Sequence, residues 1–125
     1  MMSKEEELKK ALEELKDVSG VVGSAVVTPD GLLIYSDLPE NVNKRALAAM
    51  AAAMVGTGLQ VSKELNIGKV IQVMVEARDG KFISISVGEE EDAPILSTLV
   101  GPKANLGLVM LEMEKAAKKI RKIMV

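Results

Sequence analysis

Residues able to carry chemistry are scarce in this sequence. Its 125 residues include no histidine and no cysteine, which excludes Ser-His-Asp triads, Cys-His pairs and imidazole or thiolate zinc sites. The run Glu89-Glu90-Glu91-Asp92 offers carboxylate oxygens, the ligands that a hard cation such as Ca²⁺ prefers. Adjacent residues cannot easily all converge on one ion, so we favour a solvated turn between strands. No spacing of serine with lysine, or of two carboxylates, marks a catalytic pair. We therefore expect no enzyme activity, no metal and no cofactor.

Two glycine-containing segments resemble parts of ligand sites. Gly56-Thr57-Gly58 has the composition of a nucleotide-binding loop, but it lies inside a helical pattern rather than after a strand. Residues 101–107 stand between a predicted strand and a predicted helix, where backbone amides could bind an anion. They lack the Gly-Lys-Ser/Thr of a P-loop, so we do not expect this chain to hydrolyse nucleotides. Pro102 and Asn105 are interpreted as a strand stop and a helix cap.

Composition narrows the classes of partner. The net charge is −2, and a single tyrosine and a single phenylalanine leave almost nothing on which bases could stack, so no nucleic-acid partner is expected.

No stretch offers about 20 purely apolar residues, the length that a membrane span needs. The charged N-terminus lacks the apolar core of a signal peptide. We expect a cytoplasmic protein. Its C-terminal lysines complement a helix dipole better than they indicate a membrane-surface helix.

Periodicity and turn chemistry predict three helices and five strands in one domain, residues 1–125. Ser3 with Glu6 forms a capping box, and Asn41 or Asn43 can cap the next helix. Residues 28–31, Thr-Pro-Asp-Gly, predict a hairpin turn, and the Asp-Gly pair in residues 78–80 favours a type I′ turn. The predicted elements are a helix from Ser3 that ends near Asp17 to Gly20, strands 21–27 and 32–35, a helix 44–65, strands 69–77, 81–88 and 93–101, and a helix from Leu106 to about Met124.

The order is therefore α-β-β-α-β-β-β-α. Because the hairpins are short, the sheet is expected to be antiparallel, in a layered α+β domain rather than a parallel βαβ fold.

The predicted middle helix, residues 44–65, raises the main functional question. It has no charge between Arg45 and Lys63 and is apolar on more than one side. On a helical wheel a bulky stripe should lie on the sheet: Leu47, Met50, Met54, Val61 and Leu65. A second apolar face holds Ala48, Ala52, Val55 and Leu59, and a third side holds Ala49, Ala53, Gly56 and Gln60. One sheet can cover only the first stripe, so burial inside the monomer and self-association both remain open.

Three segments in order resemble the roadblock family, named from a dynein light chain and including activators of polarity-controlling GTPases in gliding bacteria. They are GVVGSAVVTPDGLLIYSD, LAAMAAAMVGTGLQVSKEL and GPKANLGLVMLEMEKAAKKI, which lie within residues 20–120. The resemblance implies a roadblock/profilin-like five-stranded antiparallel sheet, with the middle helix on one face and the terminal helices on the other.

The resemblance also implies a homodimer in which middle helices pair and the strand at 69–77 joins its copy. Members regulate or scaffold Ras-like small GTPases, and in the bacterial activators the GTPase supplies its own catalytic groups. We therefore expect a homodimeric regulator that binds a Ras-like GTPase and modulates its activity. The alternatives are a structural adaptor without effect on GTP hydrolysis or, less favoured, a small-molecule sensor. The expected dimer interface comprises Ala49, Ala52, Ala53, Gly56, Gln60 and Val73; the expected GTPase-docking positions are Ala49, Ala53, Gln60 and Glu64.

Overall fold

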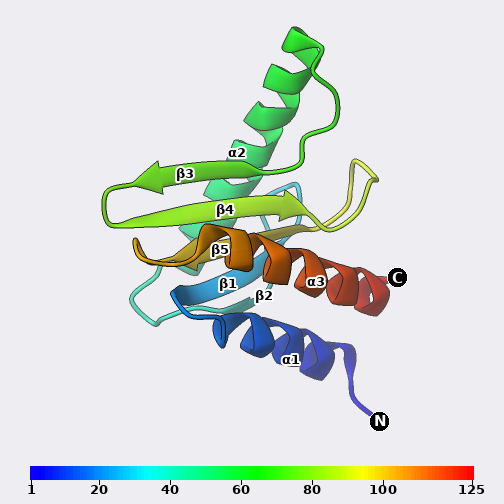
Figure 1. Cartoon of the computed structure of the whole chain (residues 1–125). Helices are drawn as coiled ribbons and strands as arrows, with labels where there is room; N and C mark the ends of the chain where they lie inside the picture. Colours follow the sequence, from blue (N-terminus) through cyan, green and yellow to red (C-terminus); the bar gives the residue numbers. More distant parts are fainter.

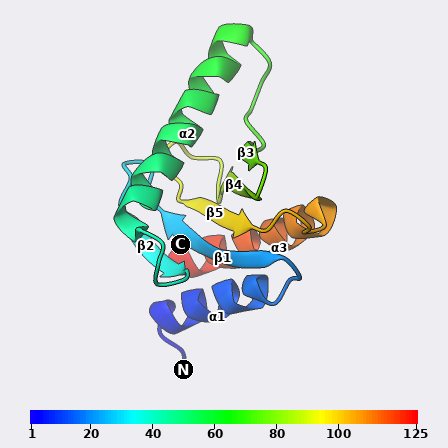
Figure 2. The same cartoon turned by 90° about the vertical axis from the view of Figure 1, so that its left-hand side faces the viewer.

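Three helices and five strands follow one another in the predicted order. A computed structural model describes all 125 residues, numbers 1–125. The elements are α1 (Lys4–Lys16), β1 (Val21–Val27), β2 (Leu33–Asp37), α2 (Lys44–Leu65), β3 (Val73–Ala77), β4 (Gly80–Ser86), β5 (Ile95–Val100) and α3 (Leu106–Met124). Helices α1 and α3 cover one face of the sheet and α2 lies on the other, which confirms the predicted layering (Figures 1 and 2).

The sheet has the strand order β2-β1-β5-β4-β3, and every neighbouring pair is antiparallel. Two hairpins, β1–β2 and β3–β4, are therefore joined by the late strand β5 between them. Strands β2 and β3 form the two edges. On its outer side β3 has no partner within the chain, so this edge presents unpaired backbone groups.

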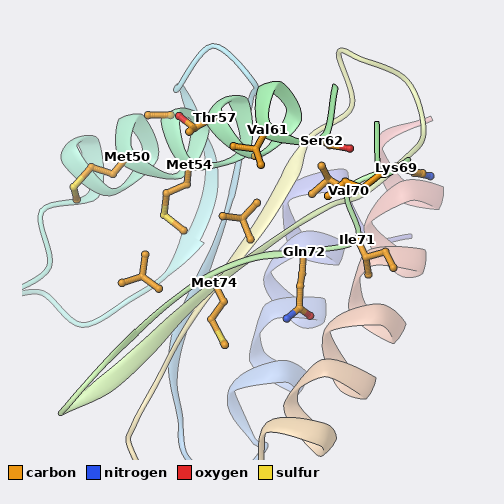
Figure 3. A pocket seen from close by; sticks show the side chains of 15 residues that line it. Met50, Met54, Thr57, Val61, Ser62, Lys69, Val70, Ile71, Gln72 and Met74 are labelled. Carbon is orange, nitrogen blue, oxygen red and sulfur yellow. The ribbon is translucent and has the colours of Figure 1, made fainter. Parts of the chain in front are cut away.

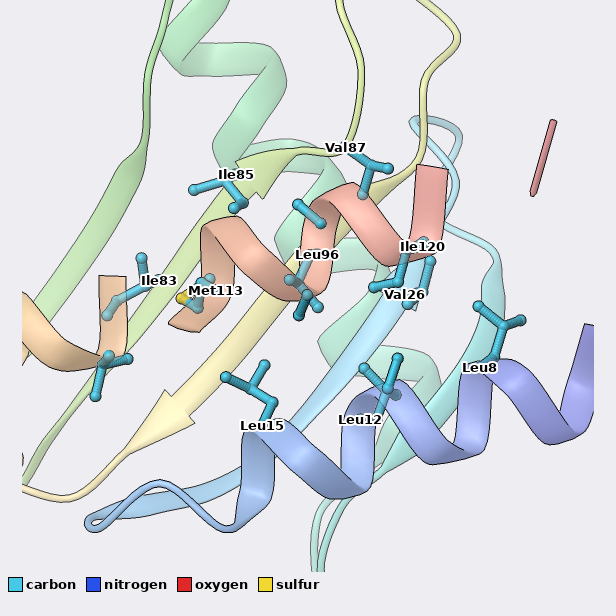
Figure 4. Close-up of a cluster of buried hydrophobic side chains, with 14 of the residues drawn as sticks. Leu8, Leu12, Leu15, Val26, Ile83, Ile85, Val87, Leu96, Met113 and Ile120 are labelled. Atoms are coloured by element: carbon cyan, nitrogen blue, oxygen red, sulfur yellow. The ribbon is translucent and has the colours of Figure 1, made fainter. Parts of the chain in front are cut away.

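The larger core lies between the sheet and the two terminal helices. Alternate residues of β4 face it, and Ile83 and Ile85 are buried there. Helix α3 supplies Met113 and Ile120, both fully buried (Figure 4). A smaller cluster on the opposite face joins α2 to β1 and β5 and consists of Ala25, Val27, Leu47, Ala48, Ala51 and Ile95.

The predicted helix caps are present. The backbone amide of Glu6 donates to Ser3 Oγ at 3.1 Å, and the Glu6 carboxylate accepts from the Ser3 amide, which completes the capping box. Asn43, rather than Asn41, caps α2 by accepting from the Ala46 amide at 3.0 Å. Asn105 caps α3 by the same geometry.

The turn of the first hairpin also follows the prediction. The Gly31 amide donates to the Thr28 carbonyl at 3.0 Å, and Gly31 has φ +89°, which glycine adopts without strain.

Two predictions about the second hairpin are wrong. Ala77 pairs with Gly80, so Arg78 and Asp79 are the central residues of the turn, and neither has the positive φ that a type I′ turn requires. The only glycine of this segment stands in the ladder, and side chains other than glycine disfavour two successive positive φ angles. The strand predicted for 69–77 begins at Val73, because residues 69–72 connect the distant end of α2 back to the sheet.

Candidate protein-interaction surface

Helix α2 contacts its own sheet over only part of its length. Its buried hydrophobic residues, Leu47, Ala48 and Ala51, all lie in the first half of the helix. The C-terminal turns of the helix extend past the β3 edge and stand away from the sheet, and residues 66–72 lead the chain back (Figures 1 and 2). A long part of an apolar helix is thus left without a sheet beneath it.

The bulky stripe predicted to lie on the sheet does so only at Leu47. Met50, Val61 and Leu65 are 57 %, 47 % and 63 % exposed, and the contact with the sheet is made instead by alanines. The physical reason lies in the sheet, where a cross-strand row of small side chains, Ala25 of β1, Ser97 of β5 and Ser84 of β4, runs beneath the helix. Small residues on both surfaces bring the backbones close together, and the large side chains are left on the flank.

The exposed stripe forms one wall of a groove with a volume of about 990 Å³. The opposite wall is the segment from Ile67 to Val75, including the N-terminal part of the edge strand β3 (Figure 3). Three methionines, Met50, Met54 and Met74, line it. Such side chains adapt their shape to a partner surface. The groove therefore combines apolar side chains with an unpaired strand edge.

The predicted interface residues lie on and beside this groove. Ala49, Ala53, Gly56 and Gln60 are exposed on the outer side of α2, and Glu64 is exposed one turn further on. Ala52 and Val73 are half-buried, Ala52 beside the hairpin turn at Gly31 and Val73 beneath Gly58. The structure thus gathers the predicted GTPase-docking positions on one accessible side, whereas Ala52 and Val73 already have contacts within the chain.

The two glycines inside α2 have different structural roles. A Cβ on Gly58 would lie 2.7 Å from Val73 Cγ2, so this glycine allows β3 to begin directly beneath the helix. A Cβ on Gly56 would have no neighbouring atom within 4 Å. Glycine in a helix interior costs about 1 kcal/mol relative to alanine, and at position 56 the monomer offers no packing reason for it.

Residues 66–72 are held through Asn66, Gly68 and Lys69, although several of their side chains are exposed. Asn66 adopts the left-handed conformation (φ 53°) that ends α2, and Ser62 Oγ donates to the Gly68 carbonyl. Lys69 forms an ion pair with Glu89 at 3.0 Å. The exposed Ile67 and Ile71 extend the apolar surface of this end of the molecule.

The acidic run is also fixed by an ion pair. Arg121 of α3 donates to both carboxylate oxygens of Glu90, at 3.1 and 2.6 Å. These hydrogen bonds lower the pKa of Glu90 to about 2.

No group of three or more acidic side chains is arranged to hold a metal ion. None of the three helices combines the length and the hydrophobicity needed to cross a bilayer.

The fold and this groove define a class: a small α+β domain with a five-stranded antiparallel sheet, helices on both faces and an exposed apolar groove beside α2. The sequence profile of the Roadblock/LC7 domain matches residues 7–92. The chain belongs to the Roadblock/LC7 domain family, as its resemblance suggested.

The uncharacterised protein MJ0714 of Methanocaldococcus jannaschii is 40 % identical over 112 residues, which cover 90 % of this chain and 92 % of that protein. The crystal structure of a Roadblock/LC7 domain from Streptomyces avermitilis superposes with a TM-score of 0.84 at 20 % identity, covering 92 % of this chain and 95 % of the other.

Two further solved structures share the fold. MglB of Myxococcus xanthus gives a TM-score of 0.86 at 21 % identity, covering 99 % of this chain and 92 % of that one. Profilin II of Acanthamoeba castellanii is more distant, with a TM-score of 0.62 at 16 % identity and coverage of 96 % and 98 %. These likenesses confirm the roadblock/profilin-like architecture.

Proposed function

We propose that this chain is a cytoplasmic homodimer that binds a Ras-like small GTPase and modulates its GTPase activity, without a catalytic site of its own. The observation that carries the proposal is the incomplete cover of α2 by its own sheet, which leaves an exposed apolar stripe on one flank of the helix and small residues on its outer side. Membership of the Roadblock/LC7 family supports it, because the family resemblance implies regulators and scaffolds of such GTPases.

A second copy of the chain is the partner proposed for the groove. The β3 edge can pair antiparallel with the β3 edge of its copy, which would satisfy the unpaired backbone groups. A two-fold axis at that edge would bring the two α2 helices side by side in opposite directions. Each exposed stripe of Met50, Val61 and Leu65 would then be covered by the other helix.

The outer side of the paired helices is the proposed docking surface for the GTPase. Ala49, Ala53 and Gln60 present a smooth surface without charge, and Glu64 borders it. Small side chains permit close approach of a partner. In this proposal the GTPase supplies the reacting groups, and the dimer acts by ordering them or holding them in place.

Two measurements test the proposal. Light scattering of the purified chain at micromolar concentration is expected to give twice the mass of one chain, and a monomer would refute the dimer. Affinity capture with the tagged chain should recover a Ras-like GTPase, whose GTP turnover is then measured with and without the chain. Changed turnover supports a regulator. Binding with unchanged turnover instead supports a structural adaptor.

A further inference from the structure

Two hydroxyl groups are buried in the larger core without a hydrogen-bond partner in the protein. Ser24 of β1 and Thr98 of β5 are both 0 % exposed, and neither side-chain oxygen forms a hydrogen bond. The two residues stand directly opposite each other in the β1–β5 register. Because side chains alternate along a strand, they share with Val26 and Leu96 the face that the terminal helices cover. The larger core thus contains an adjacent pair of unsatisfied polar groups.

The other face of the sheet holds a comparable pair that is satisfied. Ser84 and Ser97, the latter next to Thr98 in β5, are also buried cross-strand neighbours, and their hydroxyl oxygens are 2.7 Å apart in a hydrogen bond. A buried hydroxyl that lacks such a bond lowers stability, because it has lost its hydrogen bonds to water and gained none in the protein. Ser24 and Thr98 therefore favour any conformation in which water reaches them.

Helix α1 covers the part of this face to which Ser24 belongs. It packs against β1 and β2 and lies beside α3 (Figure 2). Leu12 of α1 and Val26 of β1 belong to one buried cluster, and Val26 is two residues from Ser24 on the same face (Figure 4). Displacement of α1 would therefore open the Ser24 side of the hydroxyl pair to solvent, while α3 stayed on its own side of the sheet.

The attachment of α1 to the rest of the chain is limited. Its buried side chains are four of 13: Leu8, Ala11, Leu12 and Leu15. Its ion pairs with β2 and α3 lie on the surface, where such pairs contribute little. A backbone anchor follows its C-terminal end, because the Gly101 amide donates to the Gly20 carbonyl at 2.8 Å, whereas the N-terminal end is capped by Ser3 within the segment itself. Few buried contacts are typical of elements that open locally.

We propose that α1 is a releasable cover, which moves away from the sheet about residues 17–19 while the other elements stay folded, and that Ser24 and Thr98 promote this opening. In the open state water hydrogen-bonds to both hydroxyls. The opening makes an apolar part of the sheet accessible on the face opposite the methionine-lined groove. It leaves the β3 edge and α2 unchanged, so this inference is independent of the proposed function and of the dimer.

Native-state hydrogen exchange of the full chain tests the cover. In the wild type the α1 amides are expected to exchange faster than those of β5, because they open locally. The variant Ser24→Ala/Thr98→Val removes both hydroxyls and nearly keeps the side-chain volumes. It should slow exchange of the α1 amides about tenfold, because opening no longer hydrates an unsatisfied group. The control Ser84→Ala/Ser97→Ala, beneath α2, should leave α1 exchange unchanged.

Three results of these measurements would overturn the proposal. Equal exchange of α1 and β5 amides in the wild type would mean that α1 opens only when the whole chain unfolds. Unchanged α1 exchange in Ser24→Ala/Thr98→Val would mean that the hydroxyls stay covered when α1 opens. A long-lived water with cross-peaks to both positions in nuclear Overhauser spectra would show that the pair is satisfied inside the closed protein.

Thiol labelling gives a second test, because the chain contains no cysteine. Ser24→Cys and Ser97→Cys each place one thiol at a fully buried position of the sheet, on opposite faces. A thiol-specific reagent should label Ser24→Cys at least about tenfold faster, since local opening of α1 is sufficient to expose it. Loss of the bond to Ser84 would speed labelling of the Ser97→Cys control, so the comparison is a strict one. Equal labelling rates would refute the releasable cover.

Discussion

Replacing each α2 glycine by alanine should change stability in opposite directions. At position 56 the new methyl group meets no atom within 4 Å, so only the helix propensity changes, and Gly56→Ala should stabilise the monomer by about 0.8 kcal/mol. At position 58 the methyl group would lie 2.7 Å from Val73 Cγ2, a β-branched side chain with little freedom to move. Such overpacking costs about 1–3 kcal/mol, which exceeds the gain in propensity. We therefore expect Gly58→Ala to destabilise the chain by about 1 kcal/mol net.

Thermal and urea unfolding can separate these effects. With an unfolding entropy of about 2.1 cal/mol/K per residue, a change of 1 kcal/mol moves the Tm of a chain this size by about 4 °C. Gly56→Ala should therefore raise Tm by about 3 °C, and Gly58→Ala should lower it by about 4 °C. Because dimer formation makes Tm depend on concentration, the series is measured at several protein concentrations and compared at the lowest.

Two results would contradict this reasoning about the glycines. If Gly58→Ala stabilised the chain as much as Gly56→Ala, contact with Val73 would not explain the glycine at 58. If Gly56→Ala neither stabilised the monomer nor weakened binding of any partner, the glycine at 56 would have neither a structural nor a functional explanation. The expected pattern is a more stable Gly56→Ala variant that binds its GTPase less tightly.

The remaining predictions concern the dimer and the acidic loop. Val61→Glu should convert the dimer to monomers in light scattering, because Val61 belongs to the stripe proposed to face the other helix, and burying an unpaired charge costs about 3 kcal/mol or more. The control Leu111→Glu, at an exposed position of α3, should remain dimeric, and a dimeric Val61→Glu would show that the wrong side of α2 was chosen. The pKa of Glu90 is lowered from 4.5 to about 2, so its contribution to stability is complete above pH 4.5 and is lost as the pH falls through about 2. The difference in urea midpoint between wild type and Arg121→Gln should therefore shrink over this interval, and a difference independent of pH would contradict the pairing.

Local signals in the sequence were sufficient for the framework of the fold. Ser3 with Glu6, Asn43 and Asn105 mark helix starts, because their side chains satisfy free amides within one turn. The prediction of a type I′ turn was wrong because pairing along the whole length of both strands sets the register of the hairpin. That register places Gly80 in the ladder and leaves Arg78 and Asp79 in the turn.

The candidate surface was predicted only in part, because a helical wheel contains no information about the sheet beneath it. The wheel correctly separated the small outer side at Ala49 and Ala53 from the bulky stripe. It could not show that the sheet presents Ala25, Ser84 and Ser97, which favour contact with alanines and leave Met50 exposed. The position of the acidic loop depends on Arg121, which is 31 residues from Glu90 in sequence, so no local pattern indicated it.

The position of β5 has a consequence for how the chain folds during synthesis. Each of the two hairpins forms from adjacent residues, but the only strand that connects them begins at Ile95. Until that strand has left the ribosome, the edges of β1 and β4 that it later occupies are open to pairing with other chains. Closure of the sheet is therefore a late, non-local event, and it should limit the folding rate. Helix α3 emerges after β5 and covers the finished sheet.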